Sequence, residues 1–268
     1  MFPKVLKNSI NNNFLFEISR KYLGLAILLW IFLGEVQSQD IKGVEEKGIL
    51  YKHVKHSGAT LHTQGLGINY RIGKHLTGFN YRFWDFSAIS LKHPKEIRSV
   101  NPFSSNNGGF IYGKLISLSI LRAGIGKQKA INKKGDIGGI ELSYGYYGGF
   151  SFGIARPVYL NIFYTSDQTG VKQRIEKYNP ETHFPDNIAG RASIWKGFSE
   201  PEFHPGLYAS FVLNAEFGRD PQKIHAFETG ATIDAFLNPI QIMAFNKPTN
   251  AYFTLFIRYL FGKKWNRA

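Results

Sequence analysis

Apolar and polar residues alternate over most of the chain beyond residue 45. In "GLGINYRIGKHLTGFNYRF", residues 65–83, every second residue is apolar, the pattern breaks at Gly73-Lys74-His75, and then it resumes. This period of two is typical of β-strands, because successive side chains point to opposite faces. It predicts strands at 65–72, 78–83, 110–125, 140–146, 158–164, 207–216, 227–237 and 253–262, with a weaker candidate at 49–56.

Each of these segments has one apolar face and one polar face. A soluble sandwich would bury the apolar face, whereas a membrane barrel would turn it towards lipid. Aromatic residues near the strand ends, segments that approach ten residues and the amphipathic final segment "AYFTLFIRYLFGKKWN" favour lipid. Lipid offers no hydrogen-bond partner to an open sheet edge. We therefore predict an all-β fold, a small antiparallel transmembrane β-barrel of about 8–10 strands with two long loops.

The N-terminal region has the pattern of a secretory signal peptide. Four basic residues precede "LGLAILLWIFLG", an uncharged run of 12 residues at 23–34, and the small residue Ser38 follows it. The run is shorter than the roughly 20 residues that a spanning helix needs. We predict a signal peptide at 1–38, cleavage after Ser38 and an outer-membrane β-barrel domain at 39–268. A retained N-terminal anchor helix is the alternative.

Composition narrows the class of partner. Aromatic residues make up 15% of the chain, charged residues 19%, and glycine 28 of 268 residues, which fits a β-protein with tight turns. The absence of cysteine excludes disulfide and thiolate chemistry. The formal charge is +14. Because an exported protein rarely meets nucleic acid, we expect no nucleic-acid partner, and the basic excess predicts contact with anionic lipid headgroups. A solvated basic surface is the alternative.

The polar faces of the predicted strands carry charges of both signs. Inside a narrow barrel such charges must pair or be solvated. A mixed set indicates an interlocked polar network, whereas a selective pore more often has one sign of charge around a constriction. A general diffusion porin is therefore disfavoured, and a narrow channel is kept as an alternative. The predicted lumen network comprises Arg71, Arg82, Glu141, Glu216, Glu228, Asp234 and Arg258.

Two connections are longer than strand pairing requires, Asp85 to Asn107 and Ser166 to Pro205. Strict alternation of the predicted strands places the second connection outside the cell and the first in the periplasm. The second has the aromatic and basic composition of interface anchors. We predict that it binds a partner through Arg191, Trp195, Lys196 and Phe198; a loop packed on its own barrel rim is the alternative.

Catalytic patterns are weak. The match Gly149-Phe150-Ser151-Phe152-Gly153 resembles a nucleophile elbow, which needs a strand before it and a helix after it. The following "IARPVYLNIFY" reads as a strand, so a chance match is favoured. The eight histidines are scattered without metal-ligand spacing. We therefore predict neither an enzyme nor a bound cofactor, and keep a lipid-modifying outer-membrane enzyme as a second alternative.

The ending "FIRYLFGKKWN", the hairpin "GINYRIGKHLTGFNYRF" and the block "GGIELSYGYYGGFSFGIARPVYL" resemble small exported β-barrel proteins of Bacteroidota, an uncharacterised group. The resemblance covers most of the predicted mature chain and includes no catalytic motif. It implies an outer-membrane location and a structural or interaction role. The role that it suggests is that of an accessory subunit in a larger outer-membrane assembly or secretion complex.

Overall fold

The computed structural model describes residues 51–102, 108–134, 139–166 and 170–266. Residues 49–268 form one compact unit. The predicted signal peptide at 1–38 and its cleavage after Ser38 lie outside the described residues.

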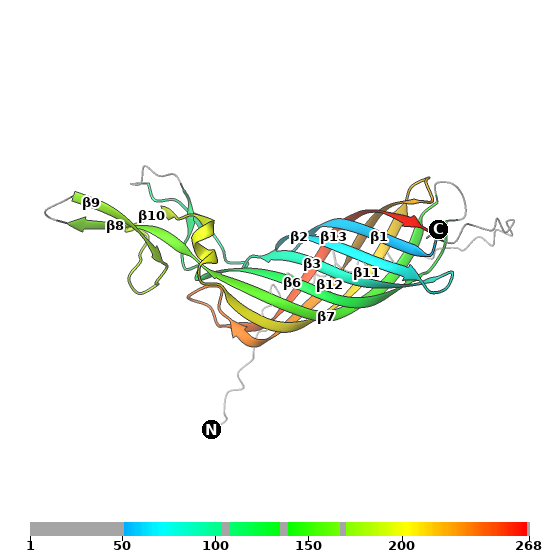
Figure 1. Cartoon of the computed structure of the whole chain (residues 1–268). Coiled ribbons are helices and arrows are strands. Elements are labelled where there is room, and N and C mark those ends of the chain that lie inside the picture. Colours follow the sequence, from blue (N-terminus) through cyan, green and yellow to red (C-terminus); the bar gives the residue numbers. More distant parts are fainter. Residues whose placement is uncertain (1–50, 103–107, 135–138, 167–169, 267–268) are drawn as a thin grey trace, which may run out of the picture. The chain divides into compact units, whose positions relative to one another are not determined.

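Eight antiparallel strands form a closed barrel, in which β1 pairs with both β2 and β13. Closure satisfies the backbone hydrogen bonds of every strand, as a lipid environment requires. This confirms the predicted all-β fold and places the strand number at the lower end of the predicted range. In chain order the barrel strands are β1 (His53–His62), β2 (Gly65–His75), β3 (Asn80–Leu91), β6 (Ile116–Ala130), β7 (Glu141–Pro157), β11 (Glu202–Phe217), β12 (Lys223–Ile240) and β13 (Thr249–Trp265) (Figure 1).

The two ends of the barrel differ. At one end, here called the turn end, the connections are 76–79, 131–140 and 218–222, and β1 begins and β13 ends there. At the other end, the loop end, a tight turn joins β1 to β2, and the longer connections 92–115, 158–201 and 241–248 emerge. The two long connections therefore lie at the same end, so the prediction that they lie on opposite sides of the membrane was wrong.

The error came from one miscounted strand. The segment predicted at 158–164 forms β8 (Tyr159–Ser166), which pairs with β9 (Gly170–Lys177) and β10 (Ile188–Arg191) in a separate three-stranded sheet. The weak candidate near residue 53 is instead the barrel strand β1. Because β8 alternates like a barrel strand, counting it reversed the assignment of every connection before it.

At the loop end the three longer connections pack into one unit, here called the loop module (the described residues of 92–115, 158–201 and 241–248). It contains the small sheet β10-β8-β9, the pair β4 (Arg98–Ser99) and β5 (Phe110–Ile111), and the 3-10 helix η1 (Ile194–Phe198). Its apolar core consists of Phe110, Leu160, Ile162, Tyr178 and Ile188. Figure 1 shows β8 and β9 continuing beyond the barrel strands.

The outer wall of the barrel is apolar. Leu66, Trp84, Phe211 and Ile257 are 65%, 59%, 51% and 59% exposed, and each of the eight barrel strands contributes such residues. An apolar band around the whole wall is far larger than the patches that soluble monomers tolerate. It matches the lipid-facing band of a membrane barrel, which the alternation predicted.

No helix among the described residues is both long enough and apolar enough to cross a bilayer.

The barrel interior is layered. Towards the turn end a cluster of buried apolar and aromatic side chains includes Val54, Phe83 and Leu260. Towards the loop end a second cluster includes Leu118, Ile120 and Phe236. Buried charged residues lie between these two clusters on the same strands, so the centre of the lumen is polar and has apolar packing on both sides of it.

The apolar cluster near the turn end explains why the two faces of β3 were assigned the wrong way round. The aromatic residues Tyr81 and Phe83 were assigned to the lipid face, but they are 6% and 2% exposed and point into the lumen. Arg82 is consequently exposed on the outer wall instead of facing the lumen as predicted. An inward aromatic layer has the same period as an outward one, so alternation alone could not show which face of β3 points into the lumen.

The outer band generates a stability prediction. Ile257→Arg places a charge against mid-membrane lipid and should lower the free energy of unfolding by about 2–4 kcal/mol. Urea unfolding of the protein in lipid bilayers measures this change. Ile175→Arg, at a site 51% exposed in β9 of the loop module, is the control and should change stability by less than about 0.5 kcal/mol. Equal effects at the two positions would contradict a lipid-facing wall.

Candidate functional site

The polar centre of the lumen is built around Glu228 on β12, which is fully buried. Its Oε2 accepts a hydrogen bond from Arg71 Nη1 at 2.5 Å, and its Oε1 accepts one from Arg258 Nη1 at 2.8 Å. Arg71 Nε also donates to Asp85 Oδ1 at 2.5 Å. Two cations and two anions thus form one neutral, buried cluster across β2, β3, β12 and β13.

Neutral groups complete this cluster. Tyr208 donates its hydroxyl to Asp85 Oδ2 at 2.9 Å, and Asn69 Nδ2 donates to Asp85 Oδ1 at 2.9 Å. Arg258 Nε donates to Thr60 Oγ1 at 2.8 Å, while the Arg71 guanidinium lies 3.8 Å from the centroid of the Tyr147 ring. These partners give the buried charges further hydrogen bonds, without which they would be strongly destabilising.

A second ion pair lies nearer the loop end. Arg122 on β6 holds Asp234 on β12 in a bidentate pair, with Nε to Oδ1 at 2.8 Å and Nη2 to Oδ2 at 2.5 Å. With this pair included, every one of the eight barrel strands contributes at least one side chain to the polar centre. We call this set the lumen network: Thr60, Asn69, Arg71, Asp85, Arg122, Tyr147, Tyr208, Glu228, Asp234 and Arg258.

The predicted lumen residues divide into three groups. Arg71, Glu228, Asp234 and Arg258 lie in the lumen network. Glu216 is buried at the turn end, where it accepts hydrogen bonds from Lys134 Nζ at 3.1 Å and Lys264 Nζ at 2.7 Å. Glu141 is half-buried there and accepts a hydrogen bond from the Tyr81 hydroxyl at 3.3 Å. Arg82 lies on the outer wall and belongs to neither site.

Sequence reasoning missed two charged members of the network. Asp85 was taken as the first residue of a loop, although β3 continues to Leu91. Arg122 lies in a segment in which both faces are apolar, because Leu118 and Ile120 pack inward at the loop end. Each of these two charged residues lies in step with the inward-facing positions of its strand, and this spacing was the signal that could have identified it.

The loop module is held together by contacts among its three connections. Arg191 N donates to Gly108 O at 3.2 Å, Leu115 N to Ile242 O at 2.9 Å, and Ala244 N to Gly113 O at 2.8 Å. Burial, followed by the neighbouring Tyr112 phenol, raises the pKa of Tyr178 in the module core to about 12. The phenol of Tyr178 is therefore neutral at physiological pH, as its apolar surroundings require.

The predicted partner-binding residues gather around η1. Its buried Gly197 lies against the end of β7, where a Cβ would come within 2.7 Å of Pro157 O. This close contact turns the neighbouring side chains outward, so that Trp195 is 79% and Phe198 48% exposed. Their ring centroids are 5.6 Å apart, and Lys196 lies exposed between them in the sequence.

Arg191 lines a hollow of about 540 Å³ beside this aromatic pair, together with Arg98, Lys114 and Trp195. Lys114 Nζ pairs with Glu96 at 2.7 Å, whereas the guanidinium groups of Arg98 and Arg191 have no ion-pair partner among the described residues. The surface therefore combines exposed aromatic rings with unneutralised cations.

Catalytic geometry is absent from the Gly-x-Ser-x-Gly segment. Ser151 lies in the middle of β7 with its side chain fully buried in the lumen, and no helix follows the strand. Among the described residues, no group of three or more His, Asp or Glu side chains is placed to hold a metal ion.

Known proteins were compared with the chain. No protein-family model matches, and no curated protein gives a significant match. Neisserial surface protein A is similar in structure, with a TM-score of 0.41 and 6% identity, over 80% of this chain and 97% of that one. Ail, the attachment invasion locus protein of Yersinia pestis, gives a TM-score of 0.36 and 9% identity over 81% of this chain and 99% of that one.

A second structure of Ail, in complex with the heparin analogue sucrose octasulfate, gives a TM-score of 0.35 at 7% identity. Scores and identities this low carry no argument about the fold. The type of barrel follows instead from three features of the chain itself, which are the closed wall, the apolar outer band and the polar, self-paired interior. The chain is a β-barrel of the outer-membrane type.

The lumen network generates a second stability prediction. Glu228→Gln keeps the side-chain volume but leaves Arg71 and Arg258 without their shared counter-charge. We expect a loss of about 3–5 kcal/mol in the free energy of unfolding, measured by urea titration in bilayers. The control is Asp220→Asn, which removes the exposed pair with Lys223 at 3.6 Å and should leave the urea midpoint close to that of the parent. A neutral Glu228→Gln would show that the lumen is hydrated and the network dispensable.

Proposed function

We propose that the barrel is an outer-membrane interaction protein that presents the loop module to the cell exterior, where the surface around η1 binds a protein partner. Outer-membrane barrels carry short turns on the periplasmic side and longer loops outside. The connections at the two ends of this barrel differ in that way. The loop end is therefore assigned to the exterior and the turn end to the periplasm.

The observation that carries the proposal is the exposure of Trp195. Trp195 is 79% exposed, so most of its large apolar ring lies in water, which is unfavourable unless a partner covers it. Here it is held out by a fixed turn, next to Phe198 and two cations, Arg191 and Lys196. Tryptophan and arginine are the residues most enriched among interface hot spots. The packed module beneath them reduces the entropy that binding would cost.

The alternative, in which the connection 158–201 only packs on its own barrel rim, accounts for part of this connection. Tyr178, His183 and Ile188 are buried within the module. Trp195 and Phe198 of η1 are exposed where η1 lies against the end of β7, and Phe203 is exposed at the start of β11. The resemblance to small Bacteroidota barrels supports a role for this surface as the contact of an accessory subunit with a larger outer-membrane complex.

The alternative of a narrow channel has less support. Apolar clusters lie on both sides of the lumen network, and the hollow beside Tyr81, Gln128 and Glu216 holds only about 20 Å³. A lipid-modifying enzyme is not favoured by any arrangement of the described side chains, since Ser151 is enclosed within the wall.

Photo-crosslinking in living cells tests the proposal. With p-benzoylphenylalanine in place of Trp195, we expect a discrete protein adduct, and with Arg191→Glu added, its yield should fall severalfold. The control places the same group at Phe184, which is 52% exposed elsewhere in the same connection and should give no such adduct. Heat-modifiable migration confirms that each variant remains a folded barrel.

Binding of the crosslinked protein, once purified, gives the magnitude. Trp195→Ala should weaken the complex by about 2 kcal/mol or more, which is roughly thirtyfold in Kd. Adducts with lipid alone at position 195 would assign η1 to the outer leaflet and contradict the protein-binding role.

A further inference from the structure

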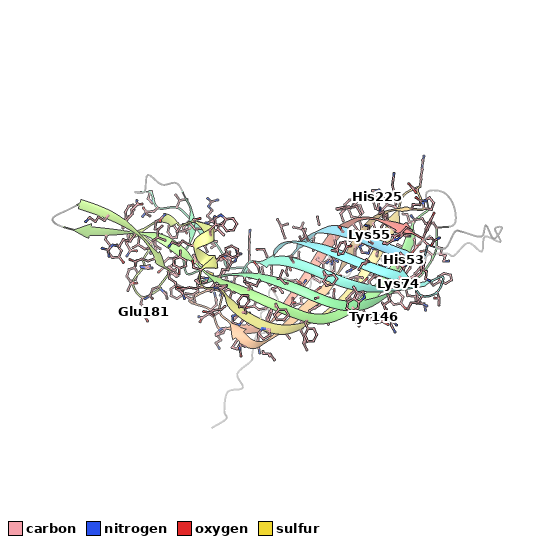
Figure 2. All side chains as sticks on the ribbon, in the orientation of Figure 1. His53, Lys55, Lys74, Tyr146, Glu181 and His225 are labelled. Carbon is pink, nitrogen blue, oxygen red and sulfur yellow. The ribbon has the colours of Figure 1, made fainter. Side chains whose placement is uncertain are left out.

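A row of three cations crosses the outer wall near the turn end. The register pairs Lys74 on β2 with Arg82 on β3, and Arg82 with Lys127 on β6. All three side chains are exposed, and none has an ion-pair partner among the described residues. Lys74 and, at the same level on β7, Tyr146 are labelled in Figure 2.

Like charges directly opposite each other on one face of a sheet are destabilising. Three such residues in line, beside the apolar row of Ile72, Trp84 and Ile125, therefore favour an anion between or above them. The lumen carboxylates cannot serve, because they lie on the opposite face of the strands. The row is placed where the wall passes from the apolar band to the turn end, at the level where lipid headgroups lie.

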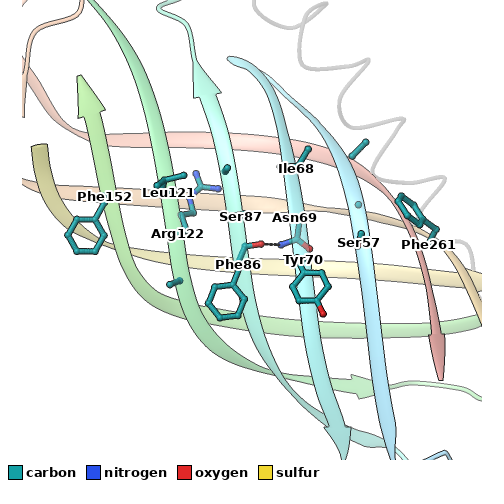
Figure 3. A pocket seen from close by; sticks show the side chains of 14 residues that line it. Ser57, Ile68, Asn69, Tyr70, Phe86, Ser87, Leu121, Arg122, Phe152 and Phe261 are labelled. Carbon is teal, nitrogen blue, oxygen red and sulfur yellow. Dashed lines mark hydrogen bonds between the residues drawn. The ribbon is translucent and has the colours of Figure 1, made fainter. Parts of the chain in front are cut away.

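An apolar groove of about 650 Å³ lies closer to the middle of the barrel, on the same three strands and on β1, β7 and β13 beside them. Its floor is made by side chains that are small where their neighbours are large. In one register row the small residues Ala59 and Ala88 alternate with Ile68 and Leu121, and in the next the small residues Ser57 and Ala123 flank Tyr70 and Phe86. Figure 3 shows Tyr70, Phe86, Leu121 and Phe152 around this groove.

The distance between the two features suits a lipid. Tyr70 and Lys74, like Phe86 and Arg82 or Ala123 and Lys127, are four residues apart along one strand, which is about 13 Å. Half the hydrocarbon thickness of a bilayer is about 15 Å. A molecule with its phosphate at the cations would thus reach the groove with an acyl chain. Ile72, Trp84 and Ile125 form the apolar row between the two features.

We propose that this wall is a binding site for an anionic glycerophospholipid of the phosphatidylglycerol class. Lys74, Arg82 and Lys127 hold its phosphate, and one acyl chain lies in the groove bordered by Tyr70 and Phe86. Since the turn end is assigned to the periplasm, the lipid belongs to the inner leaflet of the outer membrane. The site is independent of the protein-binding surface at the loop end.

Trp84 offers a direct probe, because it is 59% exposed on the wall between the cations and the groove. Trp30, Trp195 and Trp265 are the other tryptophans, and their replacement by Phe leaves Trp84 as the sole emitter. The protein is reconstituted in phosphatidylcholine bilayers that contain a few mole per cent of phosphatidylglycerol brominated on its acyl chains. Quenching is compared with that by brominated phosphatidylcholine at the same mole fraction.

We expect several-fold stronger quenching by the phosphatidylglycerol. The variant Lys74→Gln/Arg82→Gln should lose that preference, because each cation near an anionic surface contributes about fivefold to binding. The control, Arg219→Gln/Lys223→Gln, removes two exposed cations at the same end, where β11 turns into β12, and should retain the preference because neither of these strands contributes a residue to the groove. Ala123→Phe fills the groove and should also reduce the preference, with the charges unchanged.

Equal quenching by the two lipids in the parent protein would overturn the proposal. Equal losses in the two double variants would show a general basic belt in place of a site, and an unaffected Ala123→Phe would remove the groove from it. Urea midpoints close to that of the parent show that a loss of quenching is not a loss of fold.

Discussion

The structure depends on the neutralisation of charge inside a wall that faces lipid. Glu228 joins Arg71 to Arg258, and Asp85 joins Arg71 to Tyr208, so that strands distant in the sequence are held together in the lumen. Lipid offers no polar partners, so the charged side chains that the strands direct into the lumen must be paired by other groups in the lumen. Apolar clusters flank the network on either side, so these charges depend mainly on one another for neutralisation.

Both proposed sites follow from this division between wall and interior. Because the lumen is filled, function is left to the two surfaces that the barrel presents outward. At the loop end, connections that need not cross the membrane fold into a module with its own core and expose Trp195. On the wall, small residues such as Ala88 and Ala123 leave a groove below the cations Arg82 and Lys127. The eight strands therefore support the loop module, which carries the first proposed site, and their outer wall forms the second proposed site itself.

Much of the fold was predictable, since period two marks strands and the apolar wall marks lipid. The outward positions of Leu213 and Ile257 and the inward positions of Glu228 and Arg258 followed from alternation alone. The inward position of Tyr81 and the outward position of Arg82 did not, because the lumen has apolar layers with the same period as the wall. Nor could alternation separate β8 from the barrel, since a strand in a small sheet packed on Phe110 also has one apolar face. The partners of each lumen charge depend on register across the closed barrel, which local sequence does not carry.

The barrel spans the outer membrane, and in the proposed orientation its loop end faces the exterior and its turn end the periplasm. Since the chain has no cysteine, single cysteines can be introduced at Glu181 in the loop module and at Arg219 in the turn between β11 and β12, both exposed. Labelling of intact cells with a membrane-impermeant maleimide measures the accessibility of each. We expect Glu181→Cys to react in intact cells and Arg219→Cys only after the outer membrane is permeabilised. The reverse pattern, or equal labelling of both in intact cells, would contradict the account.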